Sequence, residues 1–254
     1  MLALATASST QASLIAHYKF NGNTIDSSGN GYDGINNGAT FVDSNYISFN
    51  GADSYVSLPS NLSDGLSIFS ISLLVKTTQS VATDLDWQNP TPIGFATGGG
   101  GSGDLQIISR NGHAGFYTGL GTEYSYTSGP AINDGDWHNI ILTNSGSILS
   151  LFVDGSYVSS TGVGGALAFL PFYIGAANSN FYTPSAFGHA EVSIDDVRFW
   201  DNALTSNEVQ QVAAEAPSTS TSVVPEPSSQ FGLIALGSAA VVIRRRLERT
   251  GAGR

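Results

Sequence analysis

The sequence predicts an all-β protein, a sandwich of two antiparallel β-sheets. Apolar residues recur with a period of two, or in short continuous runs, from Leu14 to Trp200, and both patterns are typical of strands. Turn signals such as Asn-Gly, Asp-Gly and Gly-Gly separate the runs, and 30 of the 254 residues are glycine. Because these runs do not alternate with amphipathic helices, a parallel α/β sheet is excluded.

The strand pattern occurs in a series of short segments. They cover residues 14–20, 46–49, 55–58, 66–76, 91–96, 105–109, 114–118, 122–127, 137–143, 148–153, 157–160, 172–174 and 191–200. Asp154-Gly155 separates two of these segments and predicts a hairpin turn. In the last segment the apolar residues change parity at Asp195-Asp196, which predicts a β-bulge there.

Two helices are expected. Thr205 has Glu208 three residues after it, which is a capping box and predicts a helix over residues 205–215. The second is a C-terminal hydrophobic helix over residues 231–243. At about 1.5 Å per residue it reaches roughly 20 Å, whereas the hydrocarbon core of a bilayer is about 30 Å thick, so its length is marginal for a membrane span.

The charge of the chain is unevenly distributed. Up to Val224 there are four basic and eighteen acidic residues, whereas five arginines and two glutamates follow. A domain this acidic repels phosphate backbones, so binding to nucleic acid is excluded. The chain contains no cysteine, which excludes disulfides, thiol catalysis and cysteine-based zinc sites.

The two ends of the chain have the composition of targeting segments. Residues 1–12 are small and apolar and fit the remnant of a signal peptide; the alternative is a disordered N-terminus. Residues 217–224 read as a linker, and residues 225–254 contain Pro225-Glu226-Pro227, the apolar run and an arginine cluster. This order resembles the PEP-CTERM sorting signal of bacteria. The resemblance implies export, processing by an exosortase-type enzyme, transient anchoring in the inner membrane through the C-terminal helix, and a final location at the cell surface or in the extracellular matrix.

Five stretches in the body occur in the order found in the laminin-G-like, concanavalin A-like lectin superfamily. They cover residues 16–31, 47–51, 69–72, 136–155 and 194–200. The chain resembles the bacterial jelly-roll form of this family over residues 13–216. The resemblance implies a β-sandwich of two curved sheets that acts in binding or adhesion.

Oxygen-bearing side chains gather in one early loop, where Asn21, Asp26, Asn30 and Asp33 lie among glycines. Calcium takes six to eight such oxygen ligands. The resemblance implies a structural calcium ion where this loop meets the last strand, so Asn21, Asp26, Asn30, Asp195 and Asp196 are the metal candidates. The alternative is that the loop residues only make turn hydrogen bonds.

Sugar sites combine aromatic faces, which cover the C–H surfaces of a sugar, with planar polar groups for its hydroxyls. Four aromatic residues lie in polar segments and are the candidate ligand contacts: Trp87, Tyr124, Tyr126 and Tyr182. Each of them could instead be packing. The resemblance assigns Trp137 to the core.

The glucanases of this superfamily carry paired carboxylates, as Glu-x-Asp-x-(x)-Glu on one strand, and Glu191-Val192-Ser193-Ile194-Asp195-Asp196 does not match. We therefore expect no enzymatic activity. The sequence favours an exported, non-catalytic binding module whose partner is a polysaccharide. The alternative is a structural or protein-adhesion component of the extracellular matrix without a sugar site.

Overall fold

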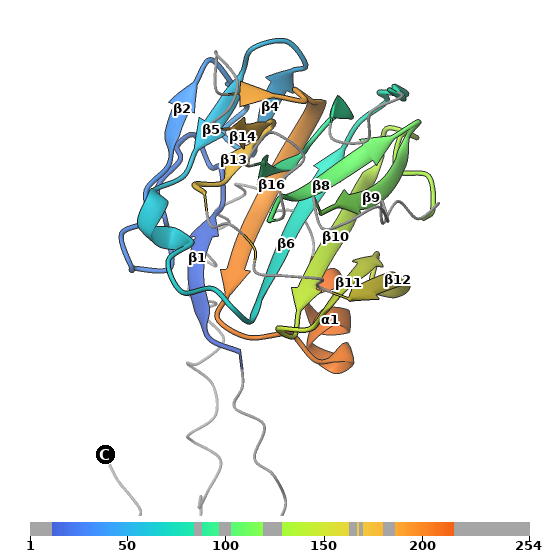
Figure 1. The fold of residues 1–254 in the computed structure, drawn as a ribbon. Coiled ribbons are helices and arrows are strands. Elements are labelled where there is room, and N and C mark those ends of the chain that lie inside the picture. Colours follow the sequence, from blue (N-terminus) through green and yellow to red (C-terminus); the bar gives the residue numbers. More distant parts are fainter. Residues whose placement is uncertain are drawn as a thin grey trace, which may run out of the picture. The chain divides into compact units, whose positions relative to one another are not determined.

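The computed structural model describes residues 12–83, 88–96, 103–118, 129–162, 167, 170–179 and 186–215, and the structural statements below concern these residues. They form two β-sheets that pack face to face, with one helix outside the sandwich (Figure 1). The predicted two-sheet sandwich is confirmed. Every strand pair is antiparallel except that of β14 with β7, which is parallel.

The first sheet contains the long strands. Its spatial order is β12 (Ser156–Gly162), β11 (Ile148–Val153), β10 (Trp137–Asn144), β6 (Phe69–Lys76), β16 (Glu191–Trp200), β4 (Tyr46–Asn50) and β3 (Thr40–Val42), and β1 (Leu14–Tyr18) also pairs with β16. The early strand β1 therefore lies beside the end of the last strand. Leu14 pairs with Trp200, and Tyr18 pairs with Val197.

The second sheet is built from shorter strands. Its spatial order is β15 (Ala186–Phe187), β14 (Ala177–Ser179), β7 (Ile93–Ala96), β13 (Tyr173–Ile174), β5 (Tyr55–Ser57) and β2 (Ile35–Asn37), with β8 (Leu105–Arg110) on β7 and β9 (His113–Tyr117) on β8. A short 3₁₀ helix, η1 (Ser60–Leu62), follows β5. The core fills the space between the two sheets with aliphatic side chains and with rings such as Phe95, Phe172 and Phe199.

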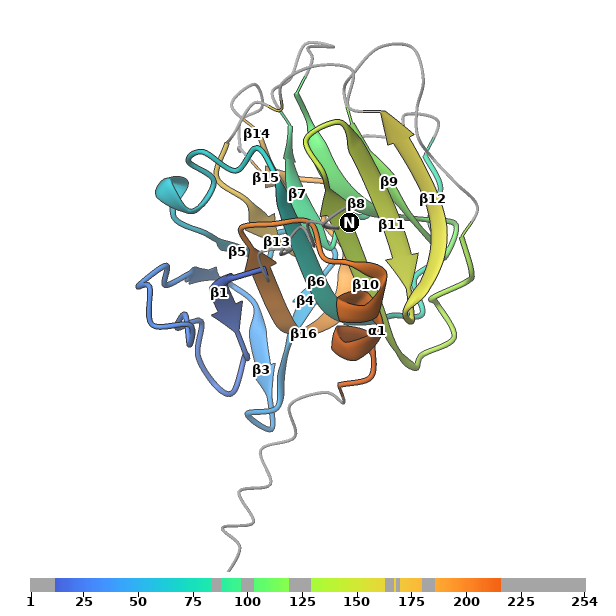
Figure 2. The same cartoon turned by 90° about the horizontal axis from the view of Figure 1, so that it is seen from below.

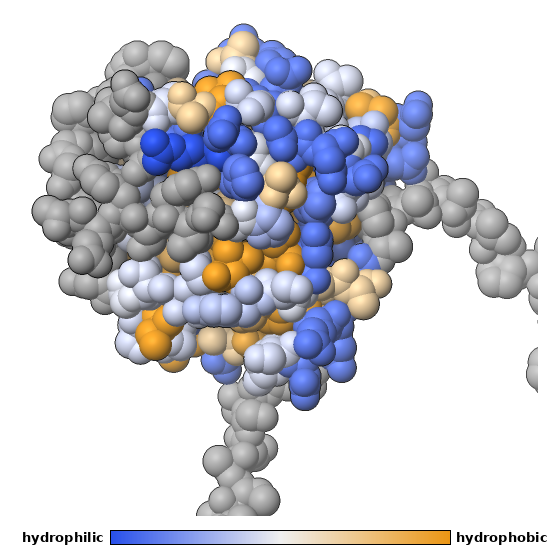
Figure 3. Space-filling view, turned by 90° about the vertical axis from the view of Figure 1, so that its right-hand side faces the viewer, coloured by the Kyte–Doolittle hydropathy of each residue, from blue (hydrophilic) through white to orange (hydrophobic). Residues whose placement is uncertain are grey.

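Close packing between the sheets depends on one glycine. Gly175 has a φ of +82°, and a Cβ built there would lie 2.2 Å from Cδ1 of Phe49. Only glycine adopts this conformation readily, and only glycine leaves room for the ring. Figure 3 shows that hydrophilic residues cover much of the described surface on one side, with apolar patches between them.

The helix α1 (Ser206–Ala213) packs against the outer face of the first sheet (Figure 2). Val209 forms a small second core with Ile141 and Trp200. The predicted capping box is confirmed, because the Thr205 hydroxyl accepts from the Glu208 backbone while the Glu208 carboxylate accepts from the Thr205 backbone. Within the described residues no helix is long and apolar enough to cross a membrane; the expected C-terminal helix over residues 231–243 lies outside them.

Two local features predicted from the sequence are confirmed. Asp154 and Gly155 both have positive φ, 51° and 74°, as the two central residues of a hairpin turn between β11 and β12 require. The pairing of β16 with β6 shifts between Asp195 and Arg198, and Asp196 has a φ of 52°. This is the expected bulge. The predicted strand over residues 122–127 lies outside the described residues.

Candidate functional site

The early loop protects the open edge of β1. The carboxylate of Asp26 accepts from the backbone N–H of His17, at 2.9 Å, and the side chains of Ser28 and Asn30 donate to the backbone carbonyl of Ile15. Ser27 also donates to the carbonyl of His17. An uncovered edge strand is a template for aggregation, so this loop closes an edge that β1 would otherwise leave open.

The Asp26 carboxylate is already well satisfied. It accepts hydrogen bonds from the backbone N–H groups of His17, Ser28 and Tyr32 and from the Ser28 hydroxyl. Burial alone raises the pKa of Asp26, but these hydrogen bonds outweigh it and hold the pKa below its ordinary value. The backbone of Asp26 in turn donates to Asp33. These hydrogen bonds hold the loop in place. They are the kind of turn hydrogen bonds that the alternative interpretation of these loop residues predicts.

The bulge residue Asp196 belongs to a buried charge network. One of its oxygens contacts the imidazole of His17, and Arg198 donates to both oxygens, at 3.0 and 2.6 Å. Arg198 also pairs with Glu215, just after α1. Burial opposes the charged form, but His17 and Arg198 lower the pKa of Asp196. The network joins β1, the bulge and the end of the helix.

In the described residues, several of the five calcium candidates have their side-chain oxygens engaged in hydrogen bonds or an ion pair. The carboxylate of Asp26 faces hydrogen-bond donors, that of Asp196 faces a guanidinium, and the side-chain amide nitrogen of Asn30 donates to the carbonyl of Ile15. Asn21 is exposed, and Asp195 is buried and accepts from the backbone of Asp196. Among the described residues, no group of three or more His, Asp or Glu side chains could hold a metal ion. Calcium therefore remains a prediction from the sequence that awaits a direct test.

The four aromatic residues selected as ligand contacts, Trp87, Tyr124, Tyr126 and Tyr182, lie outside the described residues. Another aromatic pair occupies the outer face of the first sheet. The rings of Tyr46 and Trp137 meet edge to face, with centroids 5.3 Å apart. Both side chains are partly exposed, so the assignment of Trp137 to the core is wrong.

The two rings reach over the strands that separate them. Tyr46 is on β4 and Trp137 is on β10, and β16 and β6 lie between these strands. Asp195 and Leu74 pair with each other on those two strands and are 0% and 4% exposed. The aromatic pair thus explains why an outward-facing carboxylate and leucine are buried.

A groove borders the aromatic pair. It has a volume of about 460 Å³ and is lined mainly by polar side chains, among them Ser48, Asn50, Lys76, Glu191 and Ser193. The register places it next to the rings, because Trp137 lies opposite Lys76, Lys76 opposite Ser193, and Ser193 opposite Ser48. Hydroxyl, amide, ammonium and carboxylate groups therefore surround one groove beside two aromatic rings.

The strand ends that carry the groove are held firmly. Asp154, in the hairpin turn, accepts from the backbone of Asn139 and from His138, the neighbour of Trp137. Asp134 contacts the other nitrogen of His138. Burial lowers the pKa of His138, but the two carboxylates outweigh it and raise the pKa above its ordinary value. These bonds fix the first residues of β10 and thus the position of Trp137.

A second outward aromatic pair offers less to a ligand. The rings of Tyr55 and Tyr173 on the second sheet are nearly parallel, with centroids 4.6 Å apart. Each of these rings covers a face of the other, whereas in the edge-to-face pair on the first sheet only one ring has a face covered by its partner. For this reason we take the groove beside Tyr46 and Trp137 as the candidate site.

Comparison with known families agrees with this architecture. Residues 50–210 match the laminin-G-like family described as the concanavalin A-like lectin/glucanases superfamily. The chain belongs to this superfamily. Residues 223–246 match the PEP-CTERM protein-sorting motif, which implies export and exosortase-dependent sorting to the cell surface. No curated protein matches the sequence.

Several solved structures share the concanavalin A-like fold. Domain 4 of AbnA, an extracellular arabinanase from Geobacillus stearothermophilus solved with arabinotriose, is 23% identical; the match covers 80% of this chain and 100% of that domain, with a TM-score of 0.60. The binding domain of Paraclostridial Mosquitocidal Protein 1 is 15% identical over 79% of this chain and 51% of that one, with a TM-score of 0.59. A Trypanosoma rangeli sialidase is 18% identical over 79% of this chain but only 32% of its own, with a TM-score of 0.58.

Proposed function

We propose that this protein is an exported, non-catalytic carbohydrate-binding module that acts at the cell surface or in the extracellular matrix. The groove beside Tyr46 and Trp137 is its sugar site. One observation carries the proposal: a partly exposed aromatic pair borders a polar groove on the outer face of the first sheet. A smooth face of serine and threonine alone would instead favour the structural or protein-adhesion alternative.

The chemistry of the groove suits a neutral oligosaccharide. The partly exposed rings of Tyr46 and Trp137 can cover the C–H surface of a sugar, while Ser48, Asn50 and Ser193 supply hydroxyl and amide groups for its hydroxyls. Lys76 and Glu191 place one positive and one negative charge in the same groove, so neither an acidic nor a basic sugar is favoured. The arabinanase domain solved with arabinotriose supports a sugar ligand and makes arabinotriose the first probe.

The test is a glycan array, which includes arabinotriose, followed by titration calorimetry with the best ligand. We expect Trp137→Ala and Tyr46→Ala each to weaken binding about tenfold or more, because buried aromatic anchors dominate such interfaces. Tyr157→Ala is the matched control, since Tyr157 is 60% exposed and lies on β12, away from the groove. Unchanged affinity in both groove variants, with melting temperatures like that of the parent, would overturn this site. An array without any ligand would favour the structural or adhesion role.

We also propose that the groove does not hydrolyse sugars. Glu191 lies at the groove, but Asp195, four residues further along β16, is fully buried beneath the aromatic pair. A general acid must reach the glycosidic oxygen, and this carboxylate cannot. The domains compared above include binding domains, which supports the proposal. Release of reducing ends from the bound glycan, abolished by Glu191→Gln, would contradict it.

A further inference from the structure

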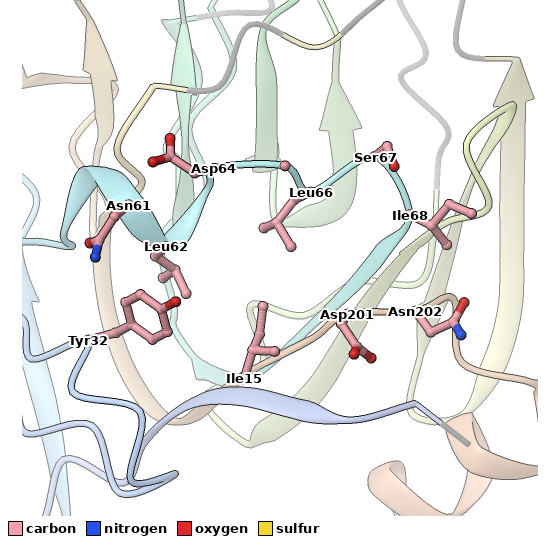
Figure 4. Close-up of a pocket in the computed structure, with 11 residues that line it drawn as sticks. Ile15, Tyr32, Asn61, Leu62, Asp64, Leu66, Ser67, Ile68, Asp201 and Asn202 are labelled. Carbon is pink, nitrogen blue, oxygen red and sulfur yellow. The ribbon is translucent and has the colours of Figure 1, made fainter. Parts of the chain in front are cut away.

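A second groove lies at one end of the sandwich, away from the site described above (Figure 4). It has a volume of about 450 Å³ and is enclosed by β1, by the segment that joins η1 to β6, and by the residues that follow β16. Ile15 points into it from β1, and Leu62 and Leu66 point into it from the opposite wall (Figure 4). Ile68 completes the apolar lining and is 40% exposed.

One aromatic residue forms a side wall. The ring of Tyr32 faces the groove (Figure 4). Its backbone is fixed on both sides, because the Tyr32 N–H donates to Asp26 and the Tyr32 carbonyl accepts from the Tyr18 hydroxyl. The groove thus combines an apolar floor with a rigidly held ring and the polar side chains of Asn61 and Ser67. Such a surface fits the C–H face of a sugar ring.

The charge of this groove differs from that of the first one. Its lining contains the exposed carboxylates of Asp64 and Asp201 and, among the described residues, no Lys, Arg or His. Part of Asp201 is engaged, since one of its oxygens accepts from the backbone of Ser13 at 2.8 Å. With two carboxylates in its lining and a domain that is strongly acidic overall, the groove favours a cation over an anion.

We propose that this groove is a second ligand site and that it takes glycans with free amino groups, such as deacetylated hexosamine units. The apolar floor and Tyr32 contact the sugar ring, and Asp64 and Asp201 pair with its ammonium groups. The idea that the ligand is a sugar rests on the proposed function, whereas the preference for a cation rests on the groove alone.

The two grooves lie at opposite ends of the same strands. The first contains Lys76 at the end of β6, and the second contains Ile68 just before β6 begins. At about 3.3 Å per residue, the eight residue steps from Ile68 to Lys76 span roughly 26 Å. Two sites this far apart would let one domain contact two glycan chains at once.

The test compares two probes that differ in charge, the trimer of glucosamine and the trimer of N-acetylglucosamine. We expect the glucosamine trimer to bind about tenfold more tightly, and we expect this preference to disappear in about 1 M salt, where the screening length is about 3 Å. The double variant Asp64→Asn/Asp201→Asn should abolish the preference. Asparagine keeps the shape and the acceptor for Ser13, so the fold should be retained, and melting curves check this.

The controls separate this site from the first. Asp43→Asn also removes an exposed carboxylate from a turn, and Asp43 does not line the groove, so this variant should leave binding unchanged. Trp137→Ala should likewise leave glucosamine-trimer binding intact. Equal affinity of the two probes, or equal losses in the double variant and in Asp43→Asn, would overturn the second site. Loss of binding only in Trp137→Ala would assign the amino sugar to the first groove and also overturn it.

Discussion

At the scale of single residues, Asp26 links the edge of β1 to the wall of the second groove. Its carboxylate accepts from His17 on the strand and from Tyr32 in the groove. The sequence makes Asp26 a calcium candidate; the structure shows its oxygens accepting hydrogen bonds, and the calcium ion stays a prediction. The number of oxygen atoms in a loop is visible in a sequence, whereas the donors that face them are set by the fold.

We predict that Asp26→Ala destabilises the domain by about 2–4 kcal/mol, because several donors lose their shared acceptor. If hydrogen bonding is the whole role of Asp26, the loss is the same with calcium and with a chelator. Urea unfolding in both conditions measures it. Asp43→Asn is the exposed control and should change stability little, because asparagine tolerates the positive φ of 49° at this turn position. A parent protein that melts several degrees lower in chelator, with that difference absent in Asp26→Ala, would instead establish the calcium site.

The pH dependence of stability follows from the two bonded carboxylates. The pKa values of Asp26 and Asp196 lie below their ordinary values in the folded chain. The unfolded chain therefore binds protons first as the pH falls, so this stabilisation is fully present above about pH 5 and is lost as the pH falls through the folded pKa values. We expect Asp26→Asn to flatten the acid side of a plot of stability against pH. If the acid side of the plot has the same slope in the variant as in the parent, Asp26 does not contribute to the pH dependence of stability.

At the scale of elements, the sequence predicts strands well when they are long or alternate clearly. β6, β10, β11 and β16 all lie within or around their predicted segments. Four short strands were missed, because segments such as Ile35–Asn37 and Ala177–Ser179 have two or three residues and little apolar pattern. These segments form strands because they pair with neighbouring strands, and a local sequence pattern does not show such pairing.

The candidate site was missed for a related reason. Tyr46 and Trp137 come from strands separated by two others, so only the sheet order brings their rings together. The strand itself gave no clear signal, because Ile140, Ile141 and Leu142 form a continuous apolar run. Only the structure shows that Ile140 and Leu142 face the core between the sheets, so that Trp137, of opposite parity, lies on the outer face.

The helix α1 depends on its capping box. We predict that Thr205→Ala destabilises the domain by about 1 kcal/mol, because the backbone N–H of Glu208 loses its acceptor, the Thr205 hydroxyl. Ser206→Ala is the matched control: Ser206 is exposed, is the first residue of the helix and caps nothing. Urea midpoints of the two variants measure the difference. Equal midpoints would mean that packing of Val209 on Ile141 and Trp200 holds the helix without the cap.

At the scale of the whole molecule, an acidic β-sandwich is followed by an arginine-containing sorting motif. The two parts carry separate information. The sandwich holds the grooves and the core, while the PEP-CTERM motif implies export and sorting to the surface. Family resemblance could establish this division from the sequence, but the resemblance covers a fold shared by binding domains and a sialidase alike. The identity of the ligand therefore has to be inferred from the chemistry of the grooves.

This division predicts that the tail governs location and not stability. A chain that ends at Pro217 should melt within about a degree of the full chain, because the core and the capping box of α1 lie before that residue. The same truncation should abolish surface localisation in the producing cell, since the sorting motif at residues 223–246 is lost. Replacing Pro225-Glu226-Pro227 with alanines in the full chain is the control that keeps the length. A truncated chain that melts several degrees lower would show that the tail packs on the domain, and one that still reaches the surface would show that the motif does not direct it there.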